Sequence, residues 1–541
     1  PAARNVTALA TLVVLYGFVV LSGLKFVLAG DKLLYAKKRW ADLALLGIIL
    51  LHLVIPATVS RLLLAVNPLL TPESLARAYL TLAQLFSILA FAPTALRYSR
   101  RIMAGNIQPP MLILLSFVIL ILIGTGLLLL PRATVGGNIP FLDALFTATS
   151  AVCVTGLIVV DTATYFTPLG HVILLGLMQI GGLGIMTLTT FFSYVMGGGA
   201  RLKEYATMQM LVGEENLGRI RRTVITIALT TLTLEAVGGF FLYEFSDSIV
   251  DSDDRIFFSI FHAVSGFCNA GFTLTTDNFA LEGIRGNAGF LTTIMALIVL
   301  GGIGFPVLSN VWSVATSRAN PRPRLSLHTK IVVFMTAILI LAGTAAFLIL
   351  DLGTGPDNSS FLDALFLSIS ARTAGFNTID TAGIALPALF VLVLLMWIGA
   401  SPGSTGGGVK TTTAALAFLN IRAVASGRNR IEMFGKQVPT TAVVKAFSTA
   451  LLSFGFIALM LFALLLTEKR PFEDLLFEVV SAMSTVGLST GVTSALSPTG
   501  KIVIILSMLF GRVGLLAVVI ALTKKKEEGY YEYTNENVLV T

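Results

Sequence analysis

The chain has 541 residues, of which 55% are hydrophobic and only 12% are charged, and its formal net charge is +8. Soluble domains carry about 25% charged residues, so this composition excludes a soluble globular protein and predicts a membrane protein in contact with lipids. In a soluble protein the positive charge would suggest nucleic acid, but here its position along the chain matters more, and we expect no nucleic-acid partner. Two cysteines exclude a disulfide scaffold.

Apolar stretches long enough to cross a bilayer recur along the chain. A helix needs about 20 apolar residues to cross a hydrocarbon core of about 30 Å. We count eleven such stretches, at residues 9–29, 42–66, 76–95, 110–130, 172–195, 222–243, 289–313, 329–350, 388–420, 441–466 and 501–522. The first lacks the basic leader and cleavage site of a signal peptide. The sequence therefore predicts a multi-pass membrane protein.

Basic residues predict the orientation. They cluster at residues 37–39, 97–101, 219–222, 318–324, 422–430 and 524–526. If the eleven stretches alternate in direction, all six clusters fall on one side, which the positive-inside rule makes cytoplasmic. We therefore expect a protein of the cell inner (plasma) membrane with its N-terminus outside and its C-terminus in the cytoplasm.

One short phrase occurs twice. FLDALF stands at 141–146 and again at 361–366, and each copy leads through small residues to a tetrapeptide with glycine at its third position. Two further stretches, ending at Phe272 and Leu488, fit the same template. The last Phe of the phrase precedes the glycine by ten residues in three copies and by nine in the third copy. Repetition at about 100 residues predicts four copies of one module: span, short half-helix, glycine loop and span.

The four tetrapeptides form a candidate cation site. They are Val154-Thr155-Gly156-Leu157, Asn269-Ala270-Gly271-Phe272, Thr373-Ala374-Gly375-Phe376 and Thr485-Val486-Gly487-Leu488. A half-helix of about ten residues re-enters the side it came from, and the non-helical loop after it is tolerated only inside protein or along a water-filled cavity. A ring of loop carbonyls can replace the hydration shell of a cation, and glycine permits the positive φ that turns carbonyls to one side. The alternative is four unrelated re-entrant turns that only hold helices together.

The sequence resembles a known family at this point. TATSAVCVTGLIVVDTATYFTPLG and SARTAGFNTID are similar to pore loops of the Trk/Ktr/HKT superfamily of potassium transporters, and the similarity covers about residues 109–541. It implies an all-α polytopic membrane protein with four M1-P-M2 repeats, like those of potassium channels, around one central pore. It also implies a homodimer, K⁺ as the transported ion, and a cytoplasmic nucleotide-binding ring that controls opening. Because this chain carries no glycine-rich nucleotide fingerprint, the nucleotide would bind only to that separate regulatory subunit.

The resemblance divides the chain into six parts. They are 1–108, with about three extra N-terminal transmembrane helices, pore repeats 109–200, 216–317, 327–422 and 438–523, and a cytoplasmic tail 524–541. The resemblance further implies that glycine at position 156 favours K⁺, since a serine there accompanies Na⁺ permeation.

A second motif interrupts the last span of the third repeat. It consists of Gly399, Ala400, Ser401, Pro402, Gly403, Ser404, Thr405, Gly406, Gly407 and Gly408. Several glycines and a proline break a helix, which is tolerable where the segment lines a cavity. The motif resembles the family's intramembrane gating loop, and a plain packing kink is the alternative. Arg512, in the middle of the last span, should face a cavity or a partner. By resemblance it projects into the pore beside the loop, and Lys410 either acts similarly or snorkels to the cytoplasmic interface.

Several single residues have plainer expected roles. We expect Cys153 and Cys268 to pack behind the loops, Arg372 to pair with an acidic neighbour, and Glu235 to link helices or, as the alternative, to form a regulatory site. Asp143, Asp363 and Asp474 begin half-helices, where a carboxylate caps free N–H groups.

The function expected from the sequence is potassium uptake through a gated four-repeat filter. The alternative is a Na⁺-permeable or ion-coupled (Na⁺/H⁺ symport) secondary transporter. An enzyme is not expected, because the spans carry no nucleophile, metal cluster or acid–base set.

Overall fold

The computed structural model describes residues 109–195, 217–247, 249–317, 324–350, 360–428 and 430–523. Within these ranges the chain is helical, apart from one antiparallel pair of two-residue strands, β1 (Glu432–Met433) and β2 (Lys436–Gln437). The expected N-terminal helices of 1–108, the connecting segment 196–216 and the tail 524–541 lie outside the described residues.

The helices form four successive units of the same design. Each unit has an outer helix, a short pore helix, a loop and a broken inner helix. Unit 1 contains α6 (Pro109–Leu128), α7 (Phe141–Cys153), α8 (Thr162–Tyr165) and α9 (Pro168–Val195). Unit 2 contains α11 (Leu217–Phe245), α12 (Arg255–Cys268), α13 (Glu282–Arg285), α14 (Ala288–Ile303) and α15 (Phe305–Thr316). Unit 3 contains α16 (Leu327–Ile349), α17 (Phe361–Ser370), η1 (Thr381–Gly383), α18 (Leu386–Trp397) and α19 (Thr411–Ala425). Unit 4 contains α20 (Thr440–Thr467), α21 (Phe472–Ser484), η2 (Thr493–Ala495), α22 (Pro498–Val513) and α23 (Leu515–Leu522).

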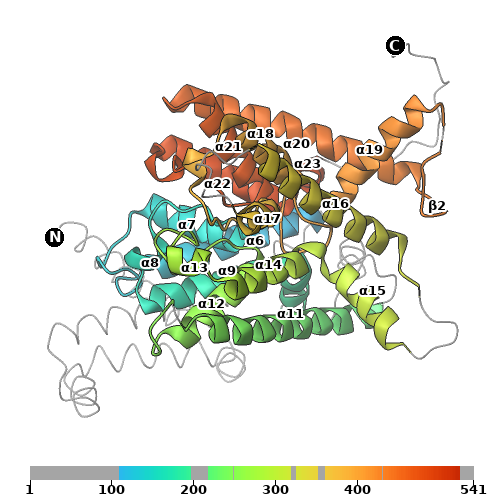
Figure 1. Ribbon diagram of the computed structural model, residues 1–541. Coiled ribbons are helices and arrows are strands. Elements are labelled where there is room, and N and C mark those ends of the chain that lie inside the picture. The colour runs from blue at the N-terminus through green and yellow to red at the C-terminus, as the bar shows by residue number, and fades with distance from the viewer. Residues whose placement is uncertain are drawn as a thin grey trace, which may run out of the picture.

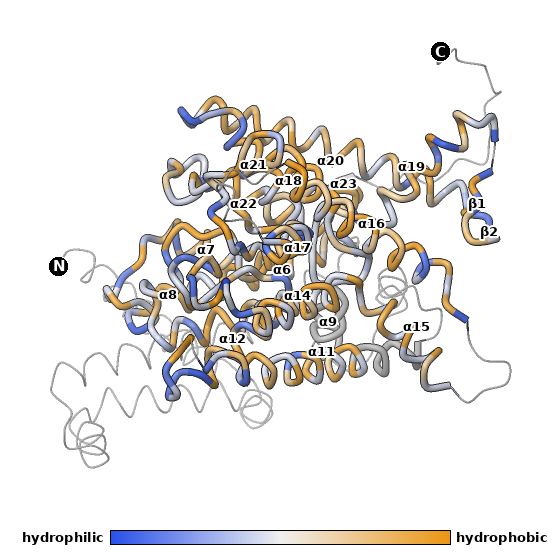
Figure 2. Tube along the Cα trace, in the orientation of Figure 1, coloured by the Kyte–Doolittle hydropathy of each residue, from blue (hydrophilic) through white to orange (hydrophobic). Residues whose placement is uncertain are grey.

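The long helices suit a bilayer. Three unbroken ones are long and apolar enough to span it, namely residues 225–245 of α11, α16 and α20; α14 with α15 and α22 with α23 qualify as spans bent by 98° and 93°. The sequence predicted eight spans over this part of the chain. The other three, α6 and the inner helices of units 1 and 3, are shorter or broken. Figure 2 shows apolar residues along the helices and polar ones gathered near α8 at one end and the β1–β2 hairpin at the other. Figure 1 shows that α8 and α13 lie at the first end, and α15 and the end of α19 at the second.

All four inner helices are broken, although the sequence predicted a break only in unit 3. Gly184, Gly304 and Gly514 have φ of 74°, 92° and 92°, outside the helical region, and the loop between α18 and α19 breaks the inner helix of unit 3. A shared pattern precedes the three glycines: GGLG at 181–184, GGIG at 301–304 and GRVG at 511–514.

The first glycine of this pattern fixes the inner helix against its own pore helix. A Cβ added to Gly181, Gly301 or Gly511 would collide with a backbone carbonyl oxygen at the end of the pore helix. The three oxygens belong to Val152, Phe267 and Met483. Because only glycine permits this approach, the pattern places the end of each pore helix beside a helix break.

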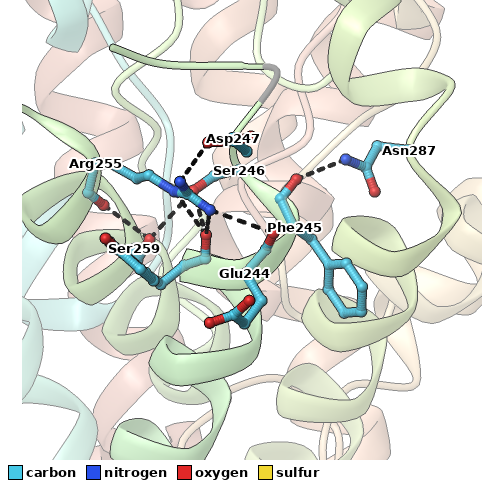
Figure 3. A network of polar contacts seen from close by, with 8 residues as sticks. Glu244, Phe245, Ser246, Asp247, Arg255, Ser259 and Asn287 are labelled. Atoms are coloured by element: carbon cyan, nitrogen blue, oxygen red, sulfur yellow. Dashed lines mark hydrogen bonds and ion pairs between the residues drawn. The ribbon is translucent and has the colours of Figure 1, made fainter. Parts of the chain in front are cut away.

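An arginine caps the C-terminal end of the outer helix of unit 2. The last turn of α11 leaves carbonyl groups without helical partners. Arg255 Nε donates to Tyr243 O at 2.7 Å, and its Nη1 bonds Asp247 Oδ1 at 2.5 Å (Figure 3). Asn287 Nδ2 donates to Phe245 O at 2.6 Å. The end of the outer helix is thereby joined to the starts of the pore helix and the inner helix.

We predict that Gly511→Ala destabilises the protein by about 3 kcal/mol, because the methyl group would overlap the Met483 carbonyl. The matched control is Gly176→Ala on α9, where an added Cβ meets nothing within 4 Å. We expect the control to be neutral or to stabilise by about 0.5–1 kcal/mol. Thermal unfolding in detergent measures both, and equal effects would contradict the close packing described above.

Candidate functional site

Three pore helices end in the same unusual conformation. The residues that follow them, Val154, Asn269 and Thr485, have left-handed φ of 56°, 58° and 51°. In each case the N–H of the next residue donates 2.8 Å to the carbonyl of a serine one turn back. Left-handed φ is costly for the β-branched valine and threonine, and such strain clusters at functional sites.

The pore helix of unit 3, α17, ends earlier in the repeat, and its left-handed residue comes one position earlier than in the other three units. It stops at Ser370, Thr373 takes the left-handed φ of 77°, and the Ala374 N–H donates to Ser370 O at 2.9 Å. The shorter ending accounts for the spacing of nine rather than ten residues in the third copy of the phrase.

The four loop glycines lie against one another in a closed ring. A Cβ added to Gly156 would lie 2.6 Å from Ala270 O and 3.0 Å from the Cα of Gly271. A Cβ on Gly271 would lie 2.8 Å from Ala374 O and 3.2 Å from the Cα of Gly375.

The ring closes through units 3, 4 and 1. A Cβ on Gly375 would meet Val486 O and the Cα of Gly487, and a Cβ on Gly487 would meet Thr155 O and the Cα of Gly156. The units therefore follow one another around the ring in chain order. Each glycine also has the positive φ that the sequence predicts, between 70° and 95°.

One carbonyl from each unit lies in this ring. The four are the carbonyls of Thr155, Ala270, Ala374 and Val486, the second residue of each tetrapeptide, and each lies against the glycine of a neighbouring unit. Side chains tie units 2 and 3 together at the first position, where the amide of Asn269 and Thr373 Oγ1 are 3.1 Å apart. The ring carries no charged side chain, so its chemistry is that of neutral backbone oxygens around a common centre.

A serine from every pore helix supports these loops, a feature that the sequence analysis missed. The four serines are fully buried, namely Ser150, Ser265, Ser370 and Ser481. Ser150 Oγ accepts from the Gly156 N–H, and Ser481 Oγ accepts from the Gly487 N–H, both at 3.1 Å. Ser265 and Ser370 instead donate to the carbonyls of Phe272 and Phe376. A serine at the same place in all four copies was visible in the sequence, but it stood among other small residues.

A second layer of polar side chains holds the chain that leaves the loops. Glu478 lies on α21, completely buried, and accepts from the hydroxyls of Ser489 and Thr493. At the equivalent place on α12, His262 Nε2 lies 3.4 Å from the Leu274 N–H. The loops are thus fixed from their pore helices at two levels.

The interrupted segment of unit 3 lies directly beside the first residues of the loops. Gly407 N–H donates to Thr485 Oγ1 at 2.8 Å, and a Cβ on Gly406 would collide with Thr373 Oγ1. On the other side, Ser401 N–H donates to Gly302 O and Phe305 N–H to Gly403 O, both at 3.0 Å. The segment is therefore held between the break of the unit 2 inner helix and the pore-helix ends of units 3 and 4.

Two basic residues bond to this segment. Arg512 is buried, and its guanidinium donates to the carbonyls of Thr405 and Gly181, the latter at 2.5 Å. Lys410 Nζ donates to Gly406 O at 2.7 Å. Arg512 joins unit 4 to the loop of unit 3 and to the break of unit 1, and Lys410 folds back onto its own loop.

Two of the singled-out residues behave as helix links. Glu235 is 6% exposed and accepts two bonds of 3.1 Å from Gln179, so it joins α11 to α9 as a buried polar link. Arg372 was expected to pair with an acid, but its Nη2 donates to Thr336 Oγ1 at 3.4 Å, and no carboxylate of the described residues lies within ion-pair distance. Cys153 and Cys268 are buried free thiols behind the loops.

Of the three aspartates expected to cap pore helices, one does so. Asp363 forms a capping box with Ser360 and also bonds Arg285 of unit 2 at 2.9 Å. Asp143 bonds Lys501 of unit 4 at 2.6 Å, and its helix has no side-chain cap. The helix that begins near Asp474 likewise has no side-chain cap. Asp143 thus joins the pore helix of unit 1 to the start of the inner helix of unit 4, its neighbour in the ring. Asp363 joins the pore helix of unit 3 to α13, the turn before the inner helix of unit 2.

Comparison with known proteins now decides the family. Residues 82–533 match the TrkH family model, described as a cation transport protein. Ktr system potassium uptake protein B of Vibrio alginolyticus is 37% identical over 436 residues, which cover 80% of this chain and 94% of that protein. The chain belongs to the TrkH family of cation transport proteins.

Other relatives agree with this assignment. Potassium/sodium uptake protein NtpJ of Enterococcus hirae is 35% identical over 456 residues, covering 80% of this chain and 98% of that protein. The crystal structure of the potassium transporter TrkH from Vibrio parahaemolyticus has a TM-score of 0.63 at 17% identity and covers 97% of this chain and 99% of that one. The predicted resemblance and the predicted helical membrane fold are both confirmed, and the family is one of transporters.

We predict that Asp363→Asn lowers the free energy of unfolding by about 2–3 kcal/mol, because it removes the negative charge that pairs with Arg285 and weakens the capping box. The matched control is Asp247→Asn, since Asp247 is 83% exposed in its pair with Arg255. An exposed pair contributes at most about 1 kcal/mol. Chemical denaturation compares the two variants, and a larger loss in the control would contradict this ranking.

Proposed function

We propose that this TrkH-family protein takes up K⁺ across the plasma membrane through the ring formed by its four loops. The ring of neutral carbonyls carries the proposal. Such oxygens replace the hydration shell of an alkali cation without trapping it as a carboxylate ring would. The names of its relatives support the choice of ion, since the proteins from Vibrio alginolyticus and Enterococcus hirae are named for potassium uptake and for potassium/sodium uptake.

The filter consists of the sixteen residues of the four tetrapeptides. The pore helices point their C-terminal ends at the loops, and the partial negative charge of a helix C-terminus attracts a cation. The left-handed residue at the end of each pore helix and the glycine at the third loop position together hold the carbonyls at the ring. The protein thus binds the ion with backbone alone, and side chains act from behind.

The gate consists of residues 399–408 with Arg512 and Lys410. The segment packs against the first residues of the filter loops of units 3 and 4, where it obstructs the path on the side opposite the outer mouth. Two cations bonded to the segment add an electrostatic barrier to K⁺. Opening requires the segment to leave the Thr485 hydroxyl and the Arg512 guanidinium.

The assembly follows from the family resemblance and from charge. We propose a homodimer with one pathway per chain, and a separate cytoplasmic nucleotide-binding ring that controls the gate. The basic clusters support a cytoplasmic C-terminus and β1–β2 hairpin, with the N-terminus outside. The two connecting regions with most basic charge, 196–222 and 418–445, are polar enough to dock this ring, and a role as ordinary positive-inside anchors is the alternative.

One observation favours a second candidate function, uptake of Na⁺ together with K⁺. The relative from Enterococcus hirae carries both ions in its name. Flux of K⁺ and Na⁺ through the purified protein in liposomes separates the candidates: K⁺ flux well above Na⁺ flux supports the main proposal, and equal fluxes support the second.

We predict that Gly156→Ser raises Na⁺ flux relative to K⁺ flux by about tenfold, the equivalent of ~1.4 kcal/mol in relative barrier height. The serine Cβ would lie 2.6 Å from Ala270 O and would displace the ring carbonyls. Gly176→Ser, in open space on α9, is the control and should keep the wild-type ratio. An unchanged flux ratio in Gly156→Ser would remove this basis for selectivity.

We predict that deleting residues 403–407, or replacing Arg512 with alanine, increases K⁺ flux in the absence of any regulator. Both changes release the segment from its bonds near the filter. Flux per inserted molecule is measured in liposomes, with thermal unfolding to show that each variant is folded. Unaltered or lower flux in folded protein would mean that the segment is only a packing kink.

A further inference from the structure

The four serines behind the filter divide the units into two kinds, and the two units of each kind are neighbours in the ring. Units 1 and 4 use the serine hydroxyl as an acceptor for the glycine N–H, at 3.1 Å. Units 2 and 3 use it as a donor to the carbonyl of the fourth loop residue, phenylalanine in both. Because the ring closes through units 4 and 1, each kind occupies one continuous half of it.

The peptide geometry gives this division a direction. The C=O and N–H of a trans peptide point in opposite directions. The N–H of Gly487 points back to Ser481 on the pore helix, and the carbonyl of the same peptide, Val486 O, lies at the ring. The same holds for Gly156 and Thr155 O in unit 1. A bond to the serine therefore marks the side of the peptide that faces away from the ion path.

In units 2 and 3 the serine holds a different peptide, the one that follows the fourth loop residue. In this peptide the carbonyl faces away from the ion path. Ser265 Oγ donates to Phe272 O at 2.7 Å, so the N–H of the same peptide, which belongs to Thr273, turns towards the path. In unit 3, Ser370 holds Phe376 O in the same way, and the N–H of Asn377 turns inwards. In contrast, no side chain of the described residues donates to the carbonyl of Leu157 or Leu488, the fourth loop residues of units 1 and 4.

Other contacts hold units 2 and 3 in this arrangement. The Phe376 ring stacks on Phe279 of unit 2 with centroids 4.9 Å apart and planes 6° apart. The Phe279 N–H donates to Asn377 O at 3.1 Å. Asn278 Nδ2 lies 3.4 Å from Gly375 O. The turned peptide of unit 3 is thus fixed from the neighbouring unit as well as from its own serine.

We infer that the outermost cation site of the filter is one-sided: Ser265 and Ser370 keep two of its four carbonyls out of the path, so an entering ion binds the Leu157 and Leu488 carbonyls of units 1 and 4. This inference rests on the proposed filter and adds a specificity-determining role for the four serines. Two carbonyls replace only part of a hydration shell, so the outermost site holds a partly hydrated ion weakly. The ring of second-position carbonyls, complete in all four units, is left as the site of tight binding.

The first test compares alanine variants from the two halves. Ser265→Ala and Ser370→Ala release the phenylalanine carbonyls, which can then turn to the path. We expect the KM for external K⁺ to fall about two- to tenfold, the range that one hydrogen-bond-sized ligand contact gives. Ser150→Ala and Ser481→Ala loosen the glycine N–H instead, so we expect KM to stay or rise and relative Na⁺ flux to increase. Flux into liposomes containing the full-length protein measures both quantities.

Threonine variants and the wild type complete the design. Ser265→Thr and Ser370→Thr retain the hydroxyl and should return KM to within about twofold of wild type, which a purely volumetric effect would not do. If all four alanine variants shift KM in one direction, or none shifts it, the serines only support packing and the inference is overturned. If neither the wild type nor the variant that lacks residues 403–407 shows K⁺ flux, the proposed filter fails instead, so the two failures are distinct.

A measurement on the wild-type protein tests the inference even if the serine variants do not fold. In crystals of the wild type with Tl⁺ in place of K⁺, anomalous scattering locates the ions. We expect the outermost ion closer to the Leu157 and Leu488 oxygens than to those of Phe272 and Phe376. An outermost ion equidistant from the four oxygens would overturn the inference.

Discussion

The contact on which the rest of the structure depends is a glycine lying against the backbone of the next unit, made four times around one centre. At each contact the space for a side chain is already occupied by a neighbouring carbonyl or Cα. The absence of a Cβ allows four loops to approach one another closely, which the proposed sharing of one cation by their carbonyls requires. It also means that the four glycines contribute no side chains to hold the ring together. The remaining architecture supplies that support from outside.

The support comes from glycine as well as from hydrogen bonds. Gly181, Gly301 and Gly511 bring each inner helix onto the end of its pore helix, and a second glycine three residues later breaks the same helix. One short sequence pattern therefore both packs the inner helix against the pore helix and bends the inner helix. In unit 3 the break is enlarged into residues 399–408, which reach under the filter. The helix break that units 1, 2 and 4 make at a single glycine thus becomes, in unit 3, the candidate gate.

Much of the architecture was predictable from sequence because the chain repeats itself. The module, the re-entrant pore helix, the positive φ of the four glycines and the break in unit 3 each follow from local rules about length and glycine. The breaks at Gly184, Gly304 and Gly514 were missed, because two or three glycines within an apolar span are compatible with a straight membrane helix. The pair of Asp143 with Lys501 was beyond prediction, since the two residues are 358 positions apart and meet only when the ring closes. The serines were visible, but nothing in the sequence shows whether a hydroxyl donates or accepts.

The central claim is that the four glycine loops surround a cation, and a density map of the full-length protein tests it most directly. The account predicts a peak enclosed by the carbonyls of Thr155, Ala270, Ala374 and Val486 in K⁺, and a weaker one when Na⁺ replaces K⁺. A map that shows these loops dispersed, or a ring that holds no ion in saturating K⁺, would contradict it.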